Sequence, residues 1–500
     1  MNTSKLLTDY FCKMNGIDPN MDFHIEYINA RELLVPDRID LVAKLKYIES
    51  RDKGLNLTYA KQLYSSHIEA FSEGTFAEPG SEFKVSLEQY FLQFDILIDS
   101  IKKHGVDSRK SAVPVGDRNI ILDGSHRTAI AIYFNFEIPI IRFNHLSVKY
   151  DIDFFRNRLL SEQYLEFLAQ EYCKLKCNVY FACLWPKAKL LEDDHRSITE
   201  LLDHKGIQCV YHREIKLTFK GIHNLITQVY SHQNWIGNIE DSFLGALDKA
   251  NACFDENGSI NIYLLECDGL PKILDFKSNV REKFGLGNHS IHITDVQKET
   301  IQIANILLNP NSVHFLNYGD PFRYKDNWKR INKFKANIIE HSLTIDEFII
   351  DTSSVMALYG IRSASDVDFL TDSNDYLILE EEGVENHSES LKYYNYSIYD
   401  LLYDPNNYLY YNDLKFITLP RVLEFKENRN EQKDREDAKL IKMSLQDRQK
   451  NFKYLLMDTM YSLKRSKRNF TRRSRSKLIL VTKKLGIYES LKSIYRSFKE

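Results

Sequence analysis

Beyond residue 178, short apolar runs alternate with longer amphipathic ones, at residues 178–316 and again at 330–448. NVYFACLW and INIYLLEC have the length of strands, whereas SITELLDHKG and KETIQIANILL have helical spacing. Strands and helices that alternate in this way fold as layers of sheet and helix. Residues 1–110 instead carry apolar positions at three-to-four spacing, which predicts helices. We therefore expect a multidomain chain of α/β and α+β type.

Composition and length are those of a folded chain. The 500 residues are 43% hydrophobic and 27% charged, which predicts three or four globular domains. We expect no signal peptide, because charges interrupt the N-terminal stretch, and no run reaches the roughly 18 apolar residues of a membrane span. Seven scattered cysteines predict reduced thiols in a cytoplasmic protein, and Cys173 and Cys177 lack the second pair that a zinc finger needs.

The sequence ILDGSHRTAIA at residues 121–131 predicts a strand, a tight turn and a helix. Ser125 is placed to cap the helix, and His126 and Arg127 follow in its first turn, beside the positive end of the helix dipole. Such a helix start binds phosphate readily, and Arg127 adds a bidentate donor. The alternative is a capped helix with a surface histidine and arginine.

The surrounding stretch VPVGDRNIILDGSHRTAIAIYFNFEIPIIRF resembles the ParB/sulfiredoxin-type domain, and is nearest to its free-serine-kinase and sulfiredoxin branches. The resemblance implies an α+β domain over residues 1–172, with a helical N-terminal part. It also implies that Gly124, Ser125, His126 and Arg127 bind a nucleotide phosphate, and it makes Asp123 one candidate for the catalytic acid. We do not recognise the DNA-binding helix-turn-helix that follows this core in partitioning proteins.

A second group of polar residues lies in NVREKFGLGNHSIHITD, which contains Arg281, His289, His292 and Asp295. Phosphohistidine chemistry needs an exposed imidazole, an orienting carboxylate and cationic groups for the phosphate. A single histidine is usually a satisfied polar residue. The prediction of a function therefore depends on two histidines spaced three apart before an aspartate.

This region resembles nucleoside diphosphate kinases, because FACLWP, HKGIQCVYHREIKLT, NVREKFG and GNHSIHITD follow in that family's order. The resemblance implies a ferredoxin-like domain over residues 173–320. It makes His292 the nucleophile, Arg281 a phosphate contact and Asp295 the acid of the segment. Trp185 stands where the family has its active-site lysine, so the alternative is a ferredoxin-like domain kept as a scaffold or for nucleotide binding.

The segment DTSSVMALYGIRSASDVDFL places two aspartates one strand step apart, after a turn rich in hydroxyl groups. In a strand, Asp366 and Asp368 point to the same face, where they can share Mg²⁺ (or Mn²⁺) ions that bridge the phosphates of a nucleoside triphosphate. Ser353 and Ser354 lie in the turn, whose helix start supplies N–H groups for the triphosphate. The alternative is an ordinary strand edge with two solvated acids.

This segment resembles the nucleotidyltransferase superfamily, in which a glycine-containing turn precedes an Asp-x-Asp strand. The Thr-Ser-Ser turn found here lacks the glycine. Over residues 321–448 the resemblance implies a mixed sheet with helices, Arg362 and Lys415 as phosphate contacts, and Asp413 as the third metal-binding carboxylate. The closing helices of that superfamily would carry Lys426, Arg429, Lys433, Asp434 and Asp437.

The last fifty residues are strongly basic. Residues 451–500 contain 14 Lys and Arg and three acidic residues, so they carry +11; because the whole chain carries −3, residues 1–450 carry −14. Basic and apolar residues interleave in 460–499, which is typical of a helix at an anionic membrane surface. We expect a basic helical tail over residues 449–500. The alternatives are nucleic-acid binding and packing on the acidic body.

All three resemblances concern nucleotide phosphates. Together they predict a phosphotransferase or nucleotidyltransferase that uses Mg²⁺ to transfer a group from a nucleoside triphosphate to a small alcohol or sugar. The expected acceptor is a glycan precursor of bacterial surface polysaccharide, handled at the inner face of the membrane. Two alternatives stay open: a ParB-like nucleotide-sensing regulator that binds nucleic acid, and a toxin or defence nucleotidyltransferase that acts on RNA or protein. Because a fold does not determine a chemistry, the geometry of the site has to decide.

Overall fold

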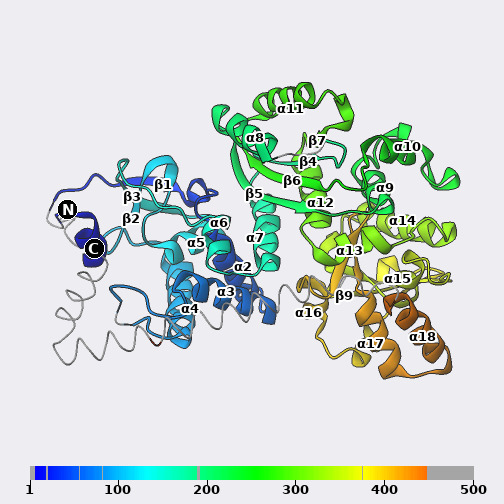
Figure 1. Cartoon of the computed structure of the whole chain (residues 1–500). Coiled ribbons are helices and arrows are strands. Elements are labelled where there is room, and N and C mark those ends of the chain that lie inside the picture. Colours follow the sequence, from blue (N-terminus) through cyan, green and yellow to red (C-terminus); the bar gives the residue numbers. More distant parts are fainter. Residues whose placement is uncertain are drawn as a thin grey trace. The chain divides into compact units, whose positions relative to one another are not determined.

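The computed structural model describes residues 6–18, 21–55, 57–81, 83–188, 192–373, 376–446 and 474, which form two compact units (Figure 1). Of these residues, 6–54 and 60–165 belong to the first unit, and 55–59 and 166–446 to the second. The predicted basic tail at 449–500 lies outside the described residues, apart from position 474. The predicted second and third domains both fall largely in the second unit, and the boundary between them stays a prediction.

The first unit combines a three-stranded sheet with helices. The sheet has the order β1-β3-β2, in which β1 (Glu26–Asn29) is antiparallel and β2 (Val113–Val115) is parallel to β3 (Glu137–Arg142). The helices are α1 (Asp9–Asn15), α2 (Asp40–Asp52), α3 (Thr58–Phe71), α4 (Leu87–His104), α5 (Ser125–Tyr133) and α6 (Ile152–Asn157). α5 follows the Asp-Gly turn and packs against α2 and α4.

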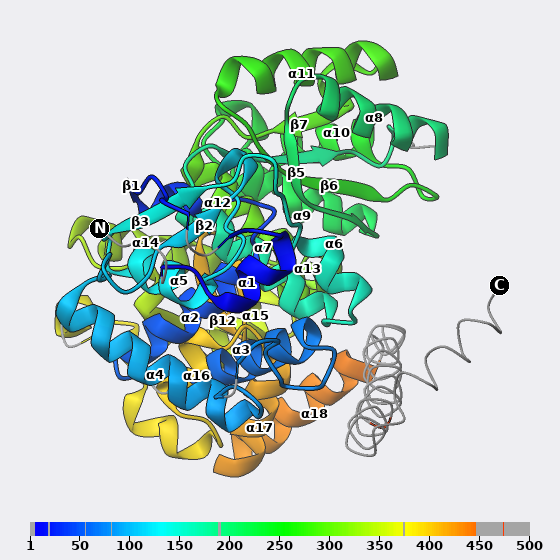
Figure 2. The same ribbon diagram turned by 90° about the vertical axis from the view of Figure 1, so that its left-hand side faces the viewer.

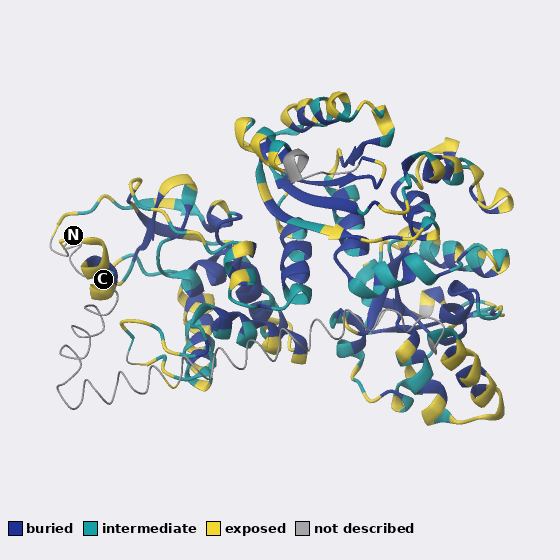
Figure 3. Ribbon diagram, viewed as in Figure 1, coloured by how far each residue is buried: buried dark blue, intermediate teal, exposed yellow. Residues whose placement is uncertain are grey.

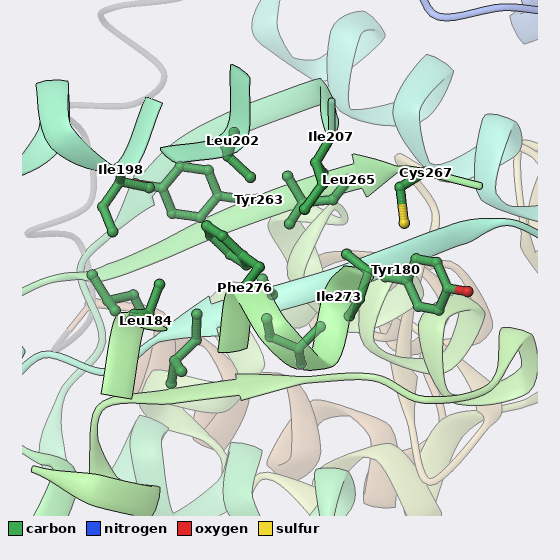
Figure 4. Close-up of a cluster of buried hydrophobic side chains, with 14 of the residues drawn as sticks. Tyr180, Leu184, Ile198, Leu202, Ile207, Tyr263, Leu265, Cys267, Ile273 and Phe276 are labelled. Atoms are coloured by element: carbon green, nitrogen blue, oxygen red, sulfur yellow. The ribbon is translucent and has the colours of Figure 1, made fainter. Parts of the chain in front are cut away.

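The second unit contains an antiparallel sheet of order β5-β6-β4-β7. Its strands are β4 (Val179–Leu184), β5 (Gln208–Ile215), β6 (Ile260–Glu266) and β7 (Ile291–Ile293). Two helices, α8 (Glu192–His204) and α11 (Leu270–Phe284), lie on the same side of this sheet in Figures 1 and 2. Figure 4 shows the apolar cluster that joins them to the sheet, with Leu202 and Phe276 from the helices and Tyr263 and Leu265 from β6.

A second sheet of this unit has the order β10-β9-β8-β12-β11 and holds the predicted Asp-x-Asp strand. Its strands are β8 (Phe348–Ile350), β9 (Val367–Thr371), β10 (Val384–Asn386), β11 (Tyr408–Tyr411) and β12 (Leu414–Ile417). β8 is antiparallel to β9 and parallel to β12, β9 is parallel to β10, and β11 and β12 form an antiparallel hairpin. Every residue of β8, β9 and β12 is buried, as expected for strands covered on both faces.

Further helices of the second unit surround the two sheets. They are α7 (Glu162–Leu175), α9 (Phe219–Val229), α10 (Leu244–Cys253), α12 (Gln297–Leu307), α13 (Pro310–Tyr318), α14 (Lys325–Glu340), α15 (Thr352–Leu358), α16 (Ile398–Tyr403), α17 (Leu419–Arg429) and α18 (Gln432–Gln446). Figure 3 shows that burial follows the strands and one side of these helices. The expected mixture of α/β and α+β layers is confirmed. None of the described helices is long and apolar enough to cross a membrane.

Candidate active site in the five-stranded sheet

The predicted Asp-x-Asp segment forms a compact strand–helix–strand unit. β8 ends at Ile350, Asp351 caps α15, and the chain then returns along β9. Asp351 caps the helix because its Oδ1 accepts a hydrogen bond from the backbone N–H of Thr352 at 2.6 Å. The Asp351 N–H donates to the carbonyl of Asp368 at 2.8 Å, so the end of β8 lies beside the start of β9. Asp366 and Asp368 are therefore at the same sheet edge as the turn.

A hydroxyl group from this turn holds each aspartate of the pair. Thr352 Oγ1 donates to Asp368 Oδ2 at 2.5 Å, and Ser353 Oγ donates to Asp366 Oδ1 at 3.1 Å. Ser354 is fully buried and donates to the carbonyl of Asp366 at 2.9 Å, so it supports the backbone instead of facing a ligand as predicted. Asp366 is partly exposed and Asp368 is 8% exposed. The two carboxylates are thus oriented by the fold itself.

A histidine that the sequence did not single out lies beside this pair. His387 follows β10, the parallel neighbour of β9. Its Nδ1 is 3.4 Å from Asp351 Oδ2, and its Nε2 is 4.0 Å from Asp368 Oδ1. Burial disfavours the charged imidazole, but the two carboxylates outweigh burial and raise the pKa of His387. Asp351 is fully buried and also accepts a short hydrogen bond from the hydroxyl of Tyr394.

Two carboxylates, those of Asp351 and Asp368, share this one imidazole. Burial is the largest cause that raises the pKa of Asp368, and the charges of Asp366 and Asp351 raise it further. His387 and the Thr352 hydroxyl act in the opposite direction without cancelling this shift. An added cation would stabilise the ionised form of such a carboxylate. This imbalance of charge is typical of a functional site.

The closing helices α17 and α18 carry a chain of ion pairs next to the site. Arg362 forms a bidentate pair with Asp437, at 2.6 and 2.8 Å. Lys426 bridges Asp437 at 3.1 Å and Asp434 at 3.0 Å, and Arg429 pairs with Asp434 at 2.7 Å. Four of the residues predicted for these helices therefore meet. The predicted phosphate contact Arg362 links the loop before β9 to α18.

Two residues predicted to complete the site lie elsewhere. β12 runs parallel to β8, so its start is at the opposite end of the sheet from Asp351. Asp413 precedes that start and forms an ion pair with Lys335 at 2.7 Å. Lys415 is 3% exposed and donates to two backbone carbonyls. The structure therefore does not bring Asp413 to the aspartate pair as a third metal ligand, nor Lys415 as a phosphate contact.

The donors at the aspartate pair are oxygen atoms, the ligands that Mg²⁺ prefers. Within the described ranges, no three His, Cys, Asp or Glu side chains are grouped closely enough to hold a metal ion alone. Mg²⁺ is commonly held by only one or two carboxylates together with substrate phosphates. Asp368 Oδ1 accepts no hydrogen bond from a described residue and so is available to a cation. The residues present therefore suit Mg²⁺.

Comparisons of the chain with known protein families, with curated proteins and with solved structures found no match. The functional conclusion therefore rests on the geometry of the site. Three of its residues were not selected from the sequence: Asp351, His387 and Tyr394; Thr352 was named only as part of the turn. Asp351 and Thr352 had a usable signal, because they directly follow an apolar run and open the turn. No sequence pattern indicated His387 or Tyr394, because these residues flank the short 3-10 helix η8 (Ser388–Tyr393), which has no periodic pattern of its own.

The second predicted group gathers around β7. His292 is 8% exposed, with its Nδ1 3.1 Å from the Tyr230 hydroxyl and its Nε2 3.2 Å from Glu299 Oε1. Burial lowers the pKa of His292, so a neutral imidazole lies between a phenol and a carboxylate. Asp295, the predicted acid, instead lies 3.5 Å from Lys277. Glu299, which the sequence did not select, lies beside the imidazole, but His292 Nε2 makes no hydrogen bond with any described residue.

Besides His292 Nε2, two buried nitrogen atoms close to β7 have no hydrogen-bond partner among the described residues. Trp185 is fully buried, and its indole N–H has no hydrogen-bond partner among the described residues. The same is true of Arg281 Nε, and the charge of this arginine acts on Tyr230. The other predicted histidine, His289, has its Nδ1 3.8 Å from the thiol of Cys253. Buried donors without a partner are rare, and they are available to an anion.

The Asp-Gly turn of the first unit differs from the expected helix cap. Gly124, and not Ser125, is the N-cap of α5, in a left-handed conformation with φ 84° that suits glycine. Ser125 is the first helical residue, so the predicted cap by its side chain is corrected. Asp123 accepts hydrogen bonds from the Gly124 N–H at 2.6 Å and from the Thr8 hydroxyl at 3.1 Å. The carboxylate of Asp123 thus holds the turn together.

The two basic residues of this turn have different surroundings. His126 is 8% exposed, with its Nε2 2.9 Å from the Tyr64 hydroxyl and its ring edge-on to Phe94. Burial lowers the pKa of His126 well below its usual range, so this residue is a neutral member of an aromatic core and not a charged phosphate contact. The guanidinium of Arg127 lies over Gly124 and makes no hydrogen bond or ion pair with any described residue. Of the two, only Arg127 offers a positive charge to an anion, and the charges of Asp123 and Glu78 already act on it.

Proposed function

We propose that the edge formed by the end of β8 and the start of β9 is a nucleotidyltransferase-type site, which transfers a nucleotidyl or phosphoryl group from a nucleoside triphosphate. The observation that carries the proposal is the hydroxyl-held carboxylate pair, Asp366 and Asp368, beside a strand–helix turn. The mixed five-stranded sheet with α17 and α18 agrees with the superfamily resemblance. The order and antiparallel pairing of the four-stranded sheet likewise support a ferredoxin-like arrangement of the nucleoside-diphosphate-kinase type.

In this proposal Asp366 and Asp368 hold Mg²⁺ or Mn²⁺. The bound ion would neutralise negative charge on the triphosphate and polarise the reacting phosphate. Ser353 keeps Asp366 oriented, and His387 balances part of the negative charge beside Asp368. The guanidinium of Arg362, which the ion-pair chain fixes on the loop before β9, supplies positive charge for the phosphates.

The test is turnover of the common nucleoside triphosphates with Mg²⁺, followed by phosphorus NMR and intact mass. We expect pyrophosphate release that falls about a thousandfold in Asp366→Asn and in Asp368→Asn, equivalent to about 4 kcal/mol of transition-state stabilisation. Asp413→Asn is the matched control, because this carboxylate lies at the other end of the same sheet, and it should keep full turnover. Full turnover in both Asp366 and Asp368 variants would contradict the proposal.

The acceptor that we propose is a small alcohol or a sugar, such as a glycan precursor, and the proposed location is the inner face of the membrane. The charge of +11 on residues 451–500 supports contact with an anionic surface. Addition of sugar alcohols and sugars to the turnover assay tests the first part. Sedimentation of the whole chain with anionic lipid vesicles, and its loss when residues 449–500 are removed, tests the second.

We propose phosphotransfer through His292 as a second candidate function, because its Nδ1 lies 3.1 Å from the Tyr230 hydroxyl and its Nε2 lies 3.2 Å from the Glu299 carboxylate. The unpaired Arg281 Nε supports an anion nearby. The expected result is an acid-labile label on the protein after incubation with γ-labelled ATP. His292→Asn should remove this label, whereas His289→Asn should leave it. An unlabelled wild-type protein would rule this second function out.

A further inference from the structure

Thr352 adopts a backbone conformation that its residue type normally avoids. Its φ is +43°, and it is the only β-branched residue with positive φ in the described part of the chain. Steric conflict between a branched Cβ and the backbone makes this conformation costly, whereas glycine adopts it freely. A glycine would therefore give the same chain path without strain. The threonine provides a side chain that glycine lacks.

The hydroxyl of that side chain fixes one oxygen of Asp368. Oγ1 of Thr352 donates to Asp368 Oδ2 at 2.5 Å, and Thr352 is 2% exposed, so water does not compete for this bond. The Thr352 backbone N–H donates at the same time to Asp351 Oδ1 at 2.6 Å. The other oxygen, Asp368 Oδ1, lies 4.0 Å from His387 Nε2, beyond hydrogen-bonding distance. Of the two oxygens of Asp368, Oδ1 is therefore the one without a hydrogen bond from a described residue.

The neighbouring aspartate is held less tightly. Ser353 contacts Asp366 Oδ1 at 3.1 Å and Ser365 contacts its Oδ2 at 3.0 Å, and Asp366 is partly exposed. Both of these hydrogen bonds are longer than that of Thr352 to Asp368, and water has access to the partly exposed Asp366. The geometric restriction at the pair is therefore concentrated on Asp368.

We propose that Thr352 is a positioning residue that makes Asp368 a one-oxygen ligand and thereby sets which divalent cation the site accepts. This inference rests on the proposed function, since it takes Asp366 and Asp368 as the cation ligands. Mg²⁺ requires a small, near-octahedral shell, whereas Ca²⁺ takes more ligands and often binds both oxygens of one carboxylate. Because the Thr352 hydroxyl already binds Oδ2 and sets the angle of the carboxylate, binding of a cation through both oxygens of Asp368 would compete with this hydrogen bond. The site therefore favours Mg²⁺ over Ca²⁺.

The experiment uses the full chain and measures binding of Mn²⁺ alone by electron paramagnetic resonance, with Mg²⁺ and Ca²⁺ affinities obtained by competition. Thr352→Ser keeps the hydroxyl and should keep the wild-type preference for Mg²⁺. Thr352→Val and Thr352→Gly lose the hydroxyl and should shift the preference toward Ca²⁺ by about tenfold, the usual effect of a group that orients a metal ligand. Thr371→Val is the matched control, because Thr371 is a buried threonine at the far end of β9 whose hydroxyl donates to the carbonyl of Glu347.

The outcomes separate this inference from the proposed function. An unchanged preference in Thr352→Val and Thr352→Gly, in a protein whose Mn²⁺ binding still needs Asp368, would overturn the role of Thr352 alone. Mn²⁺ binding that survives Asp368→Asn would remove the metal site and the proposed function with it. Thr352→Val keeps the volume and branching of threonine, so the Val and Ser pair decides the question even if the Gly variant fails to fold by circular dichroism.

Discussion

Asp40 in the first unit and Asp368 in the second are both buried carboxylates with an imidazole in their surroundings. They differ in how much positive charge lies beside them. Asp40 is 1% exposed and pairs with Arg38 at 2.8 and 2.9 Å and with Lys44 at 2.8 Å. Burial opposes its ionisation, yet these two cations hold the pKa of Asp40 far below its usual range. Burial and the charge of Lys44 lower the pKa of His67 well below its usual range, so this histidine stays neutral.

Asp368 has no comparable neutralisation. His387, at 4.0 Å, is its nearest cationic partner within the described residues, and Asp351 and Asp366 add negative charge. Its pKa is raised, whereas that of Asp40 is lowered. A buried carboxylate that is fully paired holds the fold together, and one left short of positive charge indicates a place for a ligand cation. The predictions below test whether this difference separates stability from activity.

Asp40→Asn should have the largest effect on stability. It leaves Arg38 and Lys44 buried without a counter-charge, so we expect a loss of about 3–5 kcal/mol in the free energy of unfolding, measured in urea. Asp99→Asn is the control, because it removes an exposed partner of Arg51 and should cost less than about 1 kcal/mol. Equal effects of the two substitutions would show that the Asp40 cluster is not structural.

Lys426→Met should lower the free energy of unfolding by a smaller amount. In this variant Asp434 still forms its ion pair with Arg429, and Asp437 still forms its ion pair with Arg362. We expect a loss of about 1–3 kcal/mol. Burial opposes ionisation of Asp434, but its bonds with Arg429 and Lys426 lower its pKa to about 2. The stability from this pairing is therefore complete above the ordinary Asp pKa of about 4 and is lost as pH falls toward 2. The difference in the free energy of unfolding between wild type and Lys426→Met should become smaller over that range. A difference that does not depend on pH would contradict the pairing.

Asp368→Asn should change the free energy of unfolding by no more than about 1 kcal/mol in either direction. The substitution removes a charge that Asp351 and Asp366 already disfavour, while the amide keeps an acceptor for the Thr352 hydroxyl. Thermal and urea unfolding of this variant beside Asp40→Asn gives the direct contrast. If Asp368→Asn loses as much stability as Asp40→Asn, both carboxylates stabilise the fold and the proposed difference between them is wrong.

The smallest effect concerns the pH dependence contributed by His387. Since its folded-state pKa is raised, its contribution to stability is complete below the ordinary histidine pKa of about 6.5 and is lost as pH rises through the raised value. The difference in the free energy of unfolding between wild type and His387→Gln, measured in urea, should therefore shrink as the pH rises above about 6.5. A difference that stays constant or grows would mean that the imidazole is not charged between the two aspartates.

The sequence was informative wherever one segment carries the whole pattern. Short apolar runs predicted β4 and β6 from their strand-like length, and the Asp-x-Asp segment predicted β9. Asp366, Asp368 and Ser353 meet as predicted, because a single strand–helix–strand turn contains all three. The mixed α/β and α+β character follows from the same local patterns.

Positions that depend on distant pairing were not predictable in this way. Asp413 and Lys415 lie at the start of β12, and only the parallel pairing of β12 with β8 shows that this start is remote from the turn. His126 has a polar sequence context, but Tyr64 of α3 and Phe94 of α4 enclose it. His387 reaches the site because β10 pairs with β9, a choice that no periodic pattern in its own segment indicates.

The turn between β8 and β9 also has a consequence for the order of folding. The hydroxyl bonds to Asp368 and Asp366 join residues only 16 and 13 positions apart, whereas the Tyr394 bond to Asp351 spans 43 positions. Short loops close at a lower entropic cost and sooner than long ones. The carboxylate pair and its hydroxyls can therefore assemble as a local nucleus. We therefore expect His387 and Tyr394 to join a strand pair that is already partly formed, so that the two aspartates are in place before the imidazole that offsets their charge.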